Sequence, residues 1–391
     1  MTTSSPLVAI VGGPDVDARI PLMNHLSDRY SFFAVGSSME LQTVFQSTDY
    51  PFRAYPLPSG ANPINNILAM CHLRRLFQDV KPSIVHTFDT KPSALGRIAA
   101  IWAHVPIIIG TLPGLGSLYA SDGLKTRVIR AIYEPLQQYA SHRSSWTVFQ
   151  NHDDLHVLRT KGVVRVSNSS VILGSGVDTE RYREEAVKLD EIIELRRELG
   201  ITPDSRVILM ISRLIRTKGV LQFAEAALTI RSQYPKWHFV LVGARDDSSL
   251  DRLSNSEMAF LEGQVLWLGV RQDVKVLLAM SDIFVLPTFY REGIPRVLLE
   301  AAAMGRALIT TDSPGCNEVV VDGENGYLVP PNNSEPLVAA IIRMVEMPEL
   351  RAEFGYKSRQ RAERLFSLKV VAQQTDDLYQ RLISDWSNCE D

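Results

Sequence analysis

Short apolar runs that alternate with longer helical patterns, twice along the chain, constrain the fold more than any other feature of this sequence. The runs are rich in Val, Ile and Leu and contain little polar alternation. Such runs, separated by helical segments, are typical of parallel strands that helices cover on both faces. Two series therefore predict two doubly wound α/β domains. The predicted strands are Leu7–Val11, Phe32–Val35, Ile84–Thr87, Ile107–Thr111 and Trp146–Phe149, then Val207–Ile211, Phe239–Val242, Val265–Leu268, Ile283–Leu286 and Ala307–Thr311.

The boundary between the domains is predicted near Gly174–Arg183, where two glycines follow a strand-like run and a charged helical segment begins soon afterwards. We expect a first domain over residues 1–178 and a second over residues 179–365. Residues 366–391 are predicted to form a helix that crosses back to the first domain.

Charge and cysteine content exclude several classes of protein. A formal net charge of -3 argues against a general nucleic-acid binder. The 3 cysteines are odd in number and far apart, which favours the reducing cytoplasm. The most apolar stretch, Ile98–Leu112, contains His104 and Pro106 and is too short for a membrane-spanning helix.

Ligands of open α/β sheets bind beyond the carboxyl ends of the strands, so the turns that follow strands are the places to seek chemistry. The strongest signal runs from Glu292 to Glu300. Pro295 suits the first turn of a helix, which leaves Glu292 in the preceding loop and Glu300 within the helix. The N–H groups around Gly293 and Ile294 would then face an anion. A bare pair of glutamates is, however, more often an acidic first turn followed by a solvated glutamate on the helix.

A second signal, Ile211–Gly219, also follows a strand and opens a helix. Arg213 can grip phosphate oxygens with its planar fork, and Lys218 supplies a point charge. Both would neutralise a departing diphosphate, although exposed basic side chains are the commoner explanation of either residue alone. Arg216 is expected to be merely solvated.

The first half of the chain carries weaker signals of the same kind. Gly12 and Gly13 follow the first strand and allow a phosphate to approach the backbone, although a simple tight turn fits equally well. Asp89 and Lys91 follow another strand, and Gly114 belongs to a glycine-rich loop expected at the same rim. These three would face an acceptor, or form ordinary exposed loops.

Three further features have plainer interpretations. His86 lies in a buried strand pattern and is expected to be a hydrogen-bonded core residue. Asp246 and Asp247 are expected to cap the start of a helix. The segment Gly123–Arg143 either packs on the first sheet, which its periodicity favours, or lies on anionic lipid. Its apolar residues are Leu124, Val128, Ile132 and Leu136, and its nearby basic residues are Lys125, Arg127 and Arg130.

Together, the Glu-x7-Glu segment, the Arg-x4-Lys-Gly turn and the N-terminal glycine pair resemble glycosyltransferase family 4. That retaining family has the GT-B fold, in which two Rossmann-like domains face each other across a cleft. A set of longer segments is similar to the bacterial subgroup that extends polyprenyl-diphosphate-linked oligosaccharides, which includes N-acetylgalactosaminyltransferases. These segments are His86–Gly96, Gly114–Ser117, Phe149–Asn151, Gly174–Asp178, Pro287–Arg296, Leu298–Arg306, Thr310–Cys316 and Asn325–Pro330.

The resemblance implies roles for the residues that match its motifs. Glu292 would touch donor-sugar hydroxyls and Glu300 the ribose, while Arg213 and Lys218 would clamp the diphosphate. Pro113 stands where many members carry a histidine, so a histidine-assisted mechanism is not carried over. The implied catalytic residues are Glu292, Arg213 and Lys218, the donor-binding residues Gly12, Gly13, Gly293, Ile294, Pro295 and Glu300, and the acceptor-binding residues Asp89, Lys91 and Gly114.

The resemblance also implies a function. The chain would move a hexose or N-acetylhexosamine from a nucleotide sugar, by resemblance a UDP-sugar, to a polyprenyl-diphosphate-linked saccharide. We expect no metal or other cofactor, no nucleic-acid partner, and a place in the cytoplasm at the inner membrane's cytoplasmic face. Two alternatives are a non-hydrolysing sugar-nucleotide epimerase, which the glutamate pair argues against, and a catalytically inactive nucleotide-sugar-binding scaffold, which the complete charged set argues against.

Overall fold

The computed structural model describes residues 5–57, 62–120, 123–249 and 251–390, and the chain divides into two compact units. The first unit comprises Met1–Gly176 with Leu368–Asp391, and the second comprises Val177–Ser367. These limits differ by two residues from the expected ones, 176 against 178 and 368 against 366.

The first unit is built on a seven-stranded sheet in the order β3-β2-β1-β4-β5-β6-β7. Every pair of neighbouring strands is parallel. Helices between the strands must therefore cross from one end of the sheet to the other. In chain order the strands are β1 (Leu7–Val11), β2 (Ser31–Gly36), β3 (Phe52–Ala54), β4 (Ile84–Thr87), β5 (Ile107–Leu112), β6 (Trp146–Phe149) and β7 (Ser169–Val171).

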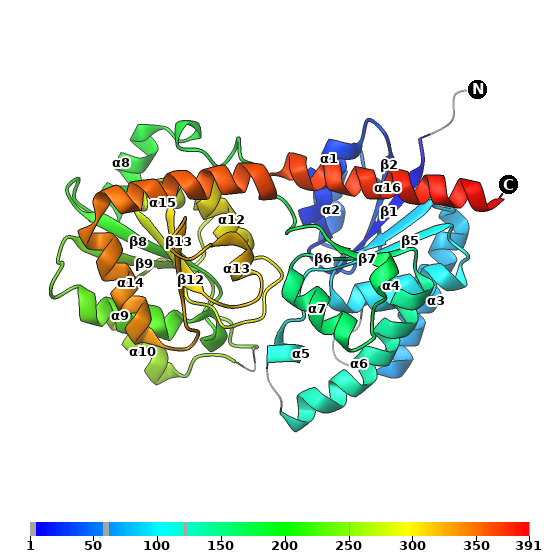
Figure 1. The fold of residues 1–391 in the computed structure, drawn as a ribbon, viewed down its shortest axis with the longest axis horizontal. Coiled ribbons are helices and arrows are strands. Elements are labelled where there is room, and N and C mark those ends of the chain that lie inside the picture. Colours follow the sequence, from blue (N-terminus) through cyan, green and yellow to red (C-terminus); the bar gives the residue numbers. More distant parts are fainter. Residues whose placement is uncertain (1–4, 58–61, 121–122, 250, 391) are drawn as a thin grey trace. The chain divides into compact units, whose positions relative to one another are not determined.

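Helices cover both faces of this sheet (Figure 1). One buried cluster joins the strands to α1 (Ile20–Leu26), α2 (Leu41–Gln46) and the last helix, α16 (Leu368–Glu390). The other cluster joins them to the second set of helices, so the sheet is buried on both sides, as its apolar strands require. That set is α3 (Pro63–Val80), α4 (Thr90–Trp102) and α6 (Leu124–Arg143); the unit also contains α5 (Ser117–Ala120) and α7 (His152–Thr160).

The second unit has a six-stranded parallel sheet in the order β10-β9-β8-β11-β12-β13. Its strands are β8 (Arg206–Ile211), β9 (Trp237–Val242), β10 (Leu266–Trp267), β11 (Ile283–Leu286), β12 (Ala307–Thr311) and β13 (Gly326–Val329). Its helices are α8 (Leu189–Glu198), α9 (Val220–Ile230), α10 (Asn255–Gln264), α11 (Val274–Met280), α12 (Arg296–Ala303), α13 (Cys316–Val319), α14 (Ser334–Glu346) and α15 (Pro348–Arg361).

The prediction of two doubly wound α/β domains is confirmed, and each of the ten predicted strands is present within one or two residues of its expected limits. The structure contains three strands that were not predicted at their observed positions. Two of them are β3 and β13. The third is β7, which begins earlier than the strand-like run near residue 171 that precedes the two boundary glycines. All three are only three or four residues long and contain partly or fully exposed residues, so none is a continuous buried apolar run.

Candidate functional site

The turn that follows β8 in the second unit has a shape that only glycine permits. Gly219 has a φ of 76°, and a Cβ atom added to it would lie 2.1 Å from the carbonyl oxygen of Pro287. Pro287 directly follows β11, so this turn presses against the end of a neighbouring strand. The amides of Phe289 and Tyr290 donate to the carbonyl oxygen of Thr217, at 2.8 and 3.0 Å, and hold the two loops together.

The same contact brings Lys218 and Glu292 together as an ion pair between the Nζ and Oε1 atoms. Their side chains are only 14% and 15% exposed. The ring of Tyr290 lies 5.2 Å from Nζ and covers the ammonium group. A shielded cation beside a shielded carboxylate can hold a phosphate oxygen and a sugar hydroxyl at adjacent points of one ligand.

A second close glycine contact packs against the loop between Glu292 and α12. Gly315 has a φ of 83°, and a Cβ atom there would lie 1.9 Å from the carbonyl oxygen of Gly293. Ile294 is buried, whereas Pro295 is the residue before the helix, which begins at Arg296. The placement of Pro295 in the first turn was thus one residue early, because its ψ of 116° is not helical.

Glu300 lies within α12, as predicted, and is almost completely buried. Burial raises the pKa of its carboxyl group, while the guanidinium of Arg296 and the hydroxyl of Tyr182 oppose that rise. The Arg296 Nε atom lies 3.2 Å from Glu300 Oε1. Sequence reasoning did not identify Tyr182, since nothing local links it to a residue in α12.

Arg213 is more than half exposed and donates from Nη1 to Asp246 Oδ2 at 2.8 Å. The expectation that Asp246 caps a helix is wrong. Its other oxygen accepts from the backbone amide of Ser249 at 3.1 Å and closes a turn, not a helix. Asp246 lies beyond the end of β9, the position that the rule for open sheets would have selected.

The expectation that Arg216 is merely solvated is also wrong. Its guanidinium forms a two-pronged ion pair with Glu257, with Nε–Oε1 and Nη2–Oε2 distances of 2.7 and 2.6 Å. Glu257 is at the same time the third residue of α10 and completes the capping box with Ser254. Arg216 therefore anchors the turn that carries Lys218.

All four charged candidates, Arg213, Lys218, Glu292 and Glu300, lie in the second unit, in loops or helices that follow the carboxyl ends of its strands. Lys218 and Glu292 contact each other directly, whereas Arg213 pairs with Asp246 and Glu300 pairs with Arg296.

The first unit brings its own predicted residues together at the carboxyl end of its sheet. The Gly13 amide donates to Asp89 Oδ2 at 3.1 Å, and the Thr90 hydroxyl donates to the Gly114 carbonyl at 3.4 Å. Burial, then repulsion from Asp15, raises the pKa of Asp89. Lys91 is the second residue of α4, and burial lowers its pKa. The Gly13 amide thus already binds a carboxylate at the place where the sequence predicts a phosphate.

His86 is a satisfied core residue, as expected. Its Nδ1 and Nε2 atoms each lie 2.7 Å from a hydroxyl, those of Tyr379 and Thr111. Desolvation lowers its pKa to about 3, so the ring is neutral at physiological pH.

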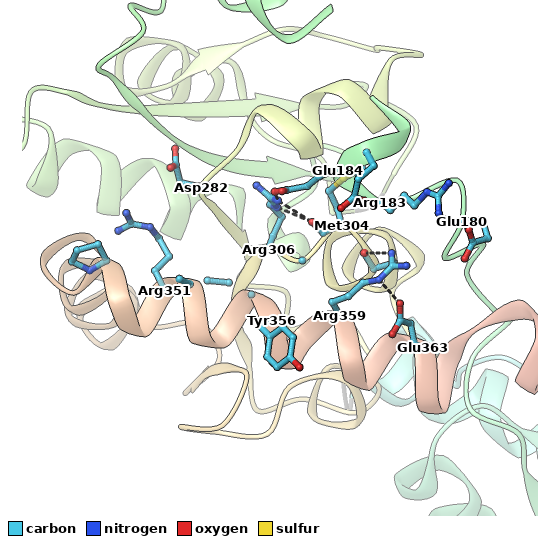
Figure 2. A pocket seen from close by; sticks show the side chains of 17 residues that line it. Glu180, Arg183, Glu184, Asp282, Met304, Arg306, Arg351, Tyr356, Arg359 and Glu363 are labelled. Carbon is cyan, nitrogen blue, oxygen red and sulfur yellow. Dashed lines mark hydrogen bonds and ion pairs between the residues drawn. The ribbon is translucent and has the colours of Figure 1, made fainter. Parts of the chain in front are cut away.

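The second unit also contains a cavity of about 820 Å³ (Figure 2). It lies where the strands begin, whereas the charged candidates follow the ends of the strands. Asp282 and Arg306, which line it, directly precede β11 and β12. Its charges largely satisfy one another: Arg306 pairs with Glu184, and Arg359 pairs with Glu363. None of the predicted site residues lines this cavity. Glu184 ties the segment at residues 180–185 to Arg306, and Arg359 of α15 donates from Nη1 to the Tyr182 carbonyl of the same segment at 2.6 Å.

The helix over Gly123–Arg143 does not pack in the way that its periodicity favoured. Leu124, Val128 and Ile132 are 81%, 55% and 56% exposed. The buried residues of α6 are instead Gln137, Ala140 and Ser141, in its second half. The preference for a helix packed on the sheet through its apolar stripe is therefore wrong, because periodicity reveals a stripe but not what covers it.

Within the described ranges, no helix combines the length and hydropathy needed to span a membrane. The same residues contain no group of three or more His, Cys, Asp or Glu placed to hold a metal ion. The expectation that the reaction needs no metal stays a prediction.

Comparison with known proteins places this geometry in a family context. Residues 191–361 match the family described as glycosyl transferases group 1, and residues 20–151 match the family described as glycosyl transferase 4-like. The N,N'-diacetylbacillosaminyl-diphospho-undecaprenol alpha-1,3-N-acetylgalactosaminyltransferase of Campylobacter jejuni is 27% identical over 370 residues, which cover 94% of this chain and 96% of that protein. The UDP-Gal:alpha-D-GlcNAc-diphosphoundecaprenol alpha-1,3-galactosyltransferase of Escherichia coli is 30% identical over 307 residues, which cover 76% and 77%.

Solved structures agree on the fold. A glycosyltransferase from Rickettsia africae superimposes with a TM-score of 0.79 at 18% identity, covering 97% of this chain and 99% of that one. The Anabaena protein HepE in complex with UDP and glucose superimposes with a TM-score of 0.76 at 19% identity, covering 96% and 100%.

Proposed function

Because the chain belongs to the group 1 glycosyltransferases, we propose that it transfers a hexose or N-acetylhexosamine from a UDP-sugar to a polyprenyl-diphosphate-linked saccharide, with retention at the anomeric carbon. The chain is a glycosyltransferase of polysaccharide synthesis; donor, acceptor and stereochemistry are the proposal. The observation that carries it is the shielded Lys218–Glu292 pair on the Gly219 turn.

The chemistry of the donor fits this pair. Breaking the bond between the sugar and the diphosphate leaves negative charge on the departing phosphate. Lys218 and the exposed fork of Arg213 supply positive charge for it, as preorganised cations do in many transferases. Glu292 would accept hydrogen bonds from sugar hydroxyls, and Glu300, buried in α12, from the ribose diol.

Retention follows if the acceptor hydroxyl attacks from the face that the diphosphate leaves. The oxygen–anomeric carbon bond forms as the carbon–phosphate oxygen bond breaks, and the departing phosphate takes the hydroxyl proton. This route uses no carboxylate nucleophile. It agrees with the observation that Glu292 is already paired with a lysine.

The acceptor is proposed to bind the first unit near Asp89, Lys91 and Gly114, which lie at the carboxyl end of its sheet. The two relatives described above both act, by their names, on sugars linked to undecaprenol through a diphosphate. A membrane-bound acceptor of this kind fits the exposed apolar residues of α6, and we propose that α6 rests on the cytoplasmic face of the membrane. Arg127 adds a positive charge that suits anionic lipid.

The test is a transfer assay with a panel of UDP-sugars and GDP-sugars and with undecaprenyl-diphosphate-linked saccharides as acceptors, followed by NMR of the product. Transfer of one UDP-linked hexose or N-acetylhexosamine as an α-glycoside supports the proposal. A β-glycoside contradicts retention. Release of an epimerised UDP-sugar without acceptor would favour an epimerase, and donor binding without turnover would favour a scaffold.

A further inference from the structure

Arg97 of α4 is the largest fully buried side chain in the described ranges, and no carboxylate there forms an ion pair with it. Its Nε atom donates to the Ser93 carbonyl at 2.9 Å and its Nη1 atom to the Thr147 hydroxyl at 3.0 Å. The guanidinium is also pressed against β5, since a Cβ atom on Gly110 would lie 2.6 Å from Nε. The Arg97 guanidinium therefore contacts residues of α4, β5 and β6 in the interior of the first unit.

Burying the Arg97 cation in the core is energetically unfavourable. Burial lowers the pKa of Arg97, but only to about 10, so the group stays charged at neutral pH. A buried charge that only neutral groups solvate is unfavourable compared with an apolar side chain of similar size. Departures of this kind from the most stable choice are expected near functional sites.

The third contact of Arg97 leads to the predicted acceptor edge. Its Nη2 atom donates to Gln137 Oε1 at 2.5 Å, which fixes the orientation of that buried amide. Gln137 Nε2 then donates to the Thr90 carbonyl at 3.2 Å and contacts the Tyr133 hydroxyl at 2.6 Å. Thr90 lies between Asp89 and Lys91, and its own hydroxyl donates to Gly114.

We propose that Arg97 and Gln137 form a positioning pair for the acceptor-binding edge. Gln137 holds the Thr90 carbonyl and, through Thr90, the loop of Gly114, and Arg97 keeps Gln137 in the one orientation that can do so. The Arg97 guanidinium contacts the Ser93 carbonyl in the first turn of α4, and Lys91 lies in the same turn. Such a place suits an acceptor that carries a diphosphate. The inference rests on the proposed function for the identity of that acceptor.

The substitution Gln137→Glu separates this role from a structural one. A carboxylate at residue 137 keeps the acceptor for Arg97 and adds a counter-charge, so the unfolding midpoint should stay at or above that of the wild type. The new carboxylate has no N–H to donate to the Thr90 carbonyl, and its negative charge cancels the positive charge of Arg97. The KM for the lipid-linked acceptor should rise about tenfold or more, as expected for a lost hydrogen bond with a facing repulsion, while the KM for the donor stays unchanged. Gln138→Glu, the same change on the exposed neighbour, should leave both constants unaltered.

Hydrogen exchange of the same variants tests the pair without relying on activity. The amides of Thr90, Lys91 and Ser93 and of residues 114–116 should exchange faster in Gln137→Glu than in the wild type and in Gln138→Glu, while exchange in the strands stays unchanged. Equal exchange, an unchanged acceptor KM, or a lower unfolding midpoint with equal effects on both substrates would overturn the inference. A wild-type protein that transfers sugar to no lipid-linked acceptor contradicts the proposed function, and the exchange rates still decide the role of the pair.

Discussion

Lys218 and Glu292, which lie 74 positions apart in the chain, form an ion pair that water barely reaches. Each side chain therefore compensates a charge that would otherwise be poorly solvated. The turn at Gly219 makes the pair possible, because only glycine fits against the Pro287 carbonyl.

The free energy of unfolding, measured without a ligand, should reveal the coupling between Lys218 and Glu292. Lys218→Met or Glu292→Gln alone removes one charge of the pair and leaves the other without its opposite charge from that pair, whereas the double variant removes both charges. We expect the double variant to be less destabilised than the sum of the two single variants, with a coupling on the order of 1–3 kcal/mol in urea unfolding. Additivity within about 0.5 kcal/mol would show that the pair contributes nothing beyond its separate members.

The pH dependence of stability should contain a contribution from His86. Its pKa is lowered to about 3 in the folded chain, against 6.5 for an ordinary, solvated histidine. Below pH 6.5 the unfolded chain binds a proton that the folded chain does not, so this stability is complete above pH 6.5 and is lost as the pH falls toward 3. Between about pH 7 and pH 5 the loss should be about 2 kcal/mol.

The comparison is between the wild type and His86→Gln, each unfolded in urea from about pH 7 to about pH 5. The variant can keep hydrogen bonds to the hydroxyls of Tyr379 and Thr111 but has no group that titrates in this range. We expect a shallower loss of stability with falling pH in the variant. Parallel curves would mean that the buried imidazole takes up its proton without unfolding.

Membrane binding through α6 can be measured by flotation with vesicles that contain anionic lipid. Val128→Glu combined with Ile132→Glu places charge on two exposed positions, so folding should be preserved while flotation is lost. The matched control is Leu189→Glu with Ile193→Glu, an equally spaced exposed pair on α8 of the second unit. Equal flotation of both double variants and the wild type would exclude α6 as the contact.

The sequence was sufficient for the core strands and insufficient for the contacts between loops. β1 and β11 are continuous apolar runs, so their positions follow from solvent exclusion alone. The pairing of Lys218 with Glu292 depends on two loops that meet only in the folded unit, and the pattern predicts both residues but not their contact. The prediction for Arg216 failed for the same reason: the Ser254–Glu257 capping box is readable in the sequence, but the second role of Glu257 is not.

α6 shows a different limit. Its stripe of Leu124, Val128 and Ile132 has the spacing of a core-facing helix, yet the helix packs through Gln137 and Ala140. A buried glutamine in an exposed-looking position makes sense only with Arg97, which comes from another helix. Helix periodicity cannot reveal such a partner.

Turnover of the Lys218→Ala variant tests the central claim most directly. Transfer of radiolabelled sugar from the donor to a lipid-linked acceptor should be measured at saturating substrate for the wild type, Lys218→Ala and Lys236→Ala, where Lys236 is an exposed lysine paired only at the surface. Loss of a preorganised charge at the departing phosphate predicts a fall of roughly 10²–10³-fold for Lys218→Ala and none for Lys236→Ala. Wild-type turnover by a folded Lys218→Ala protein would contradict the account.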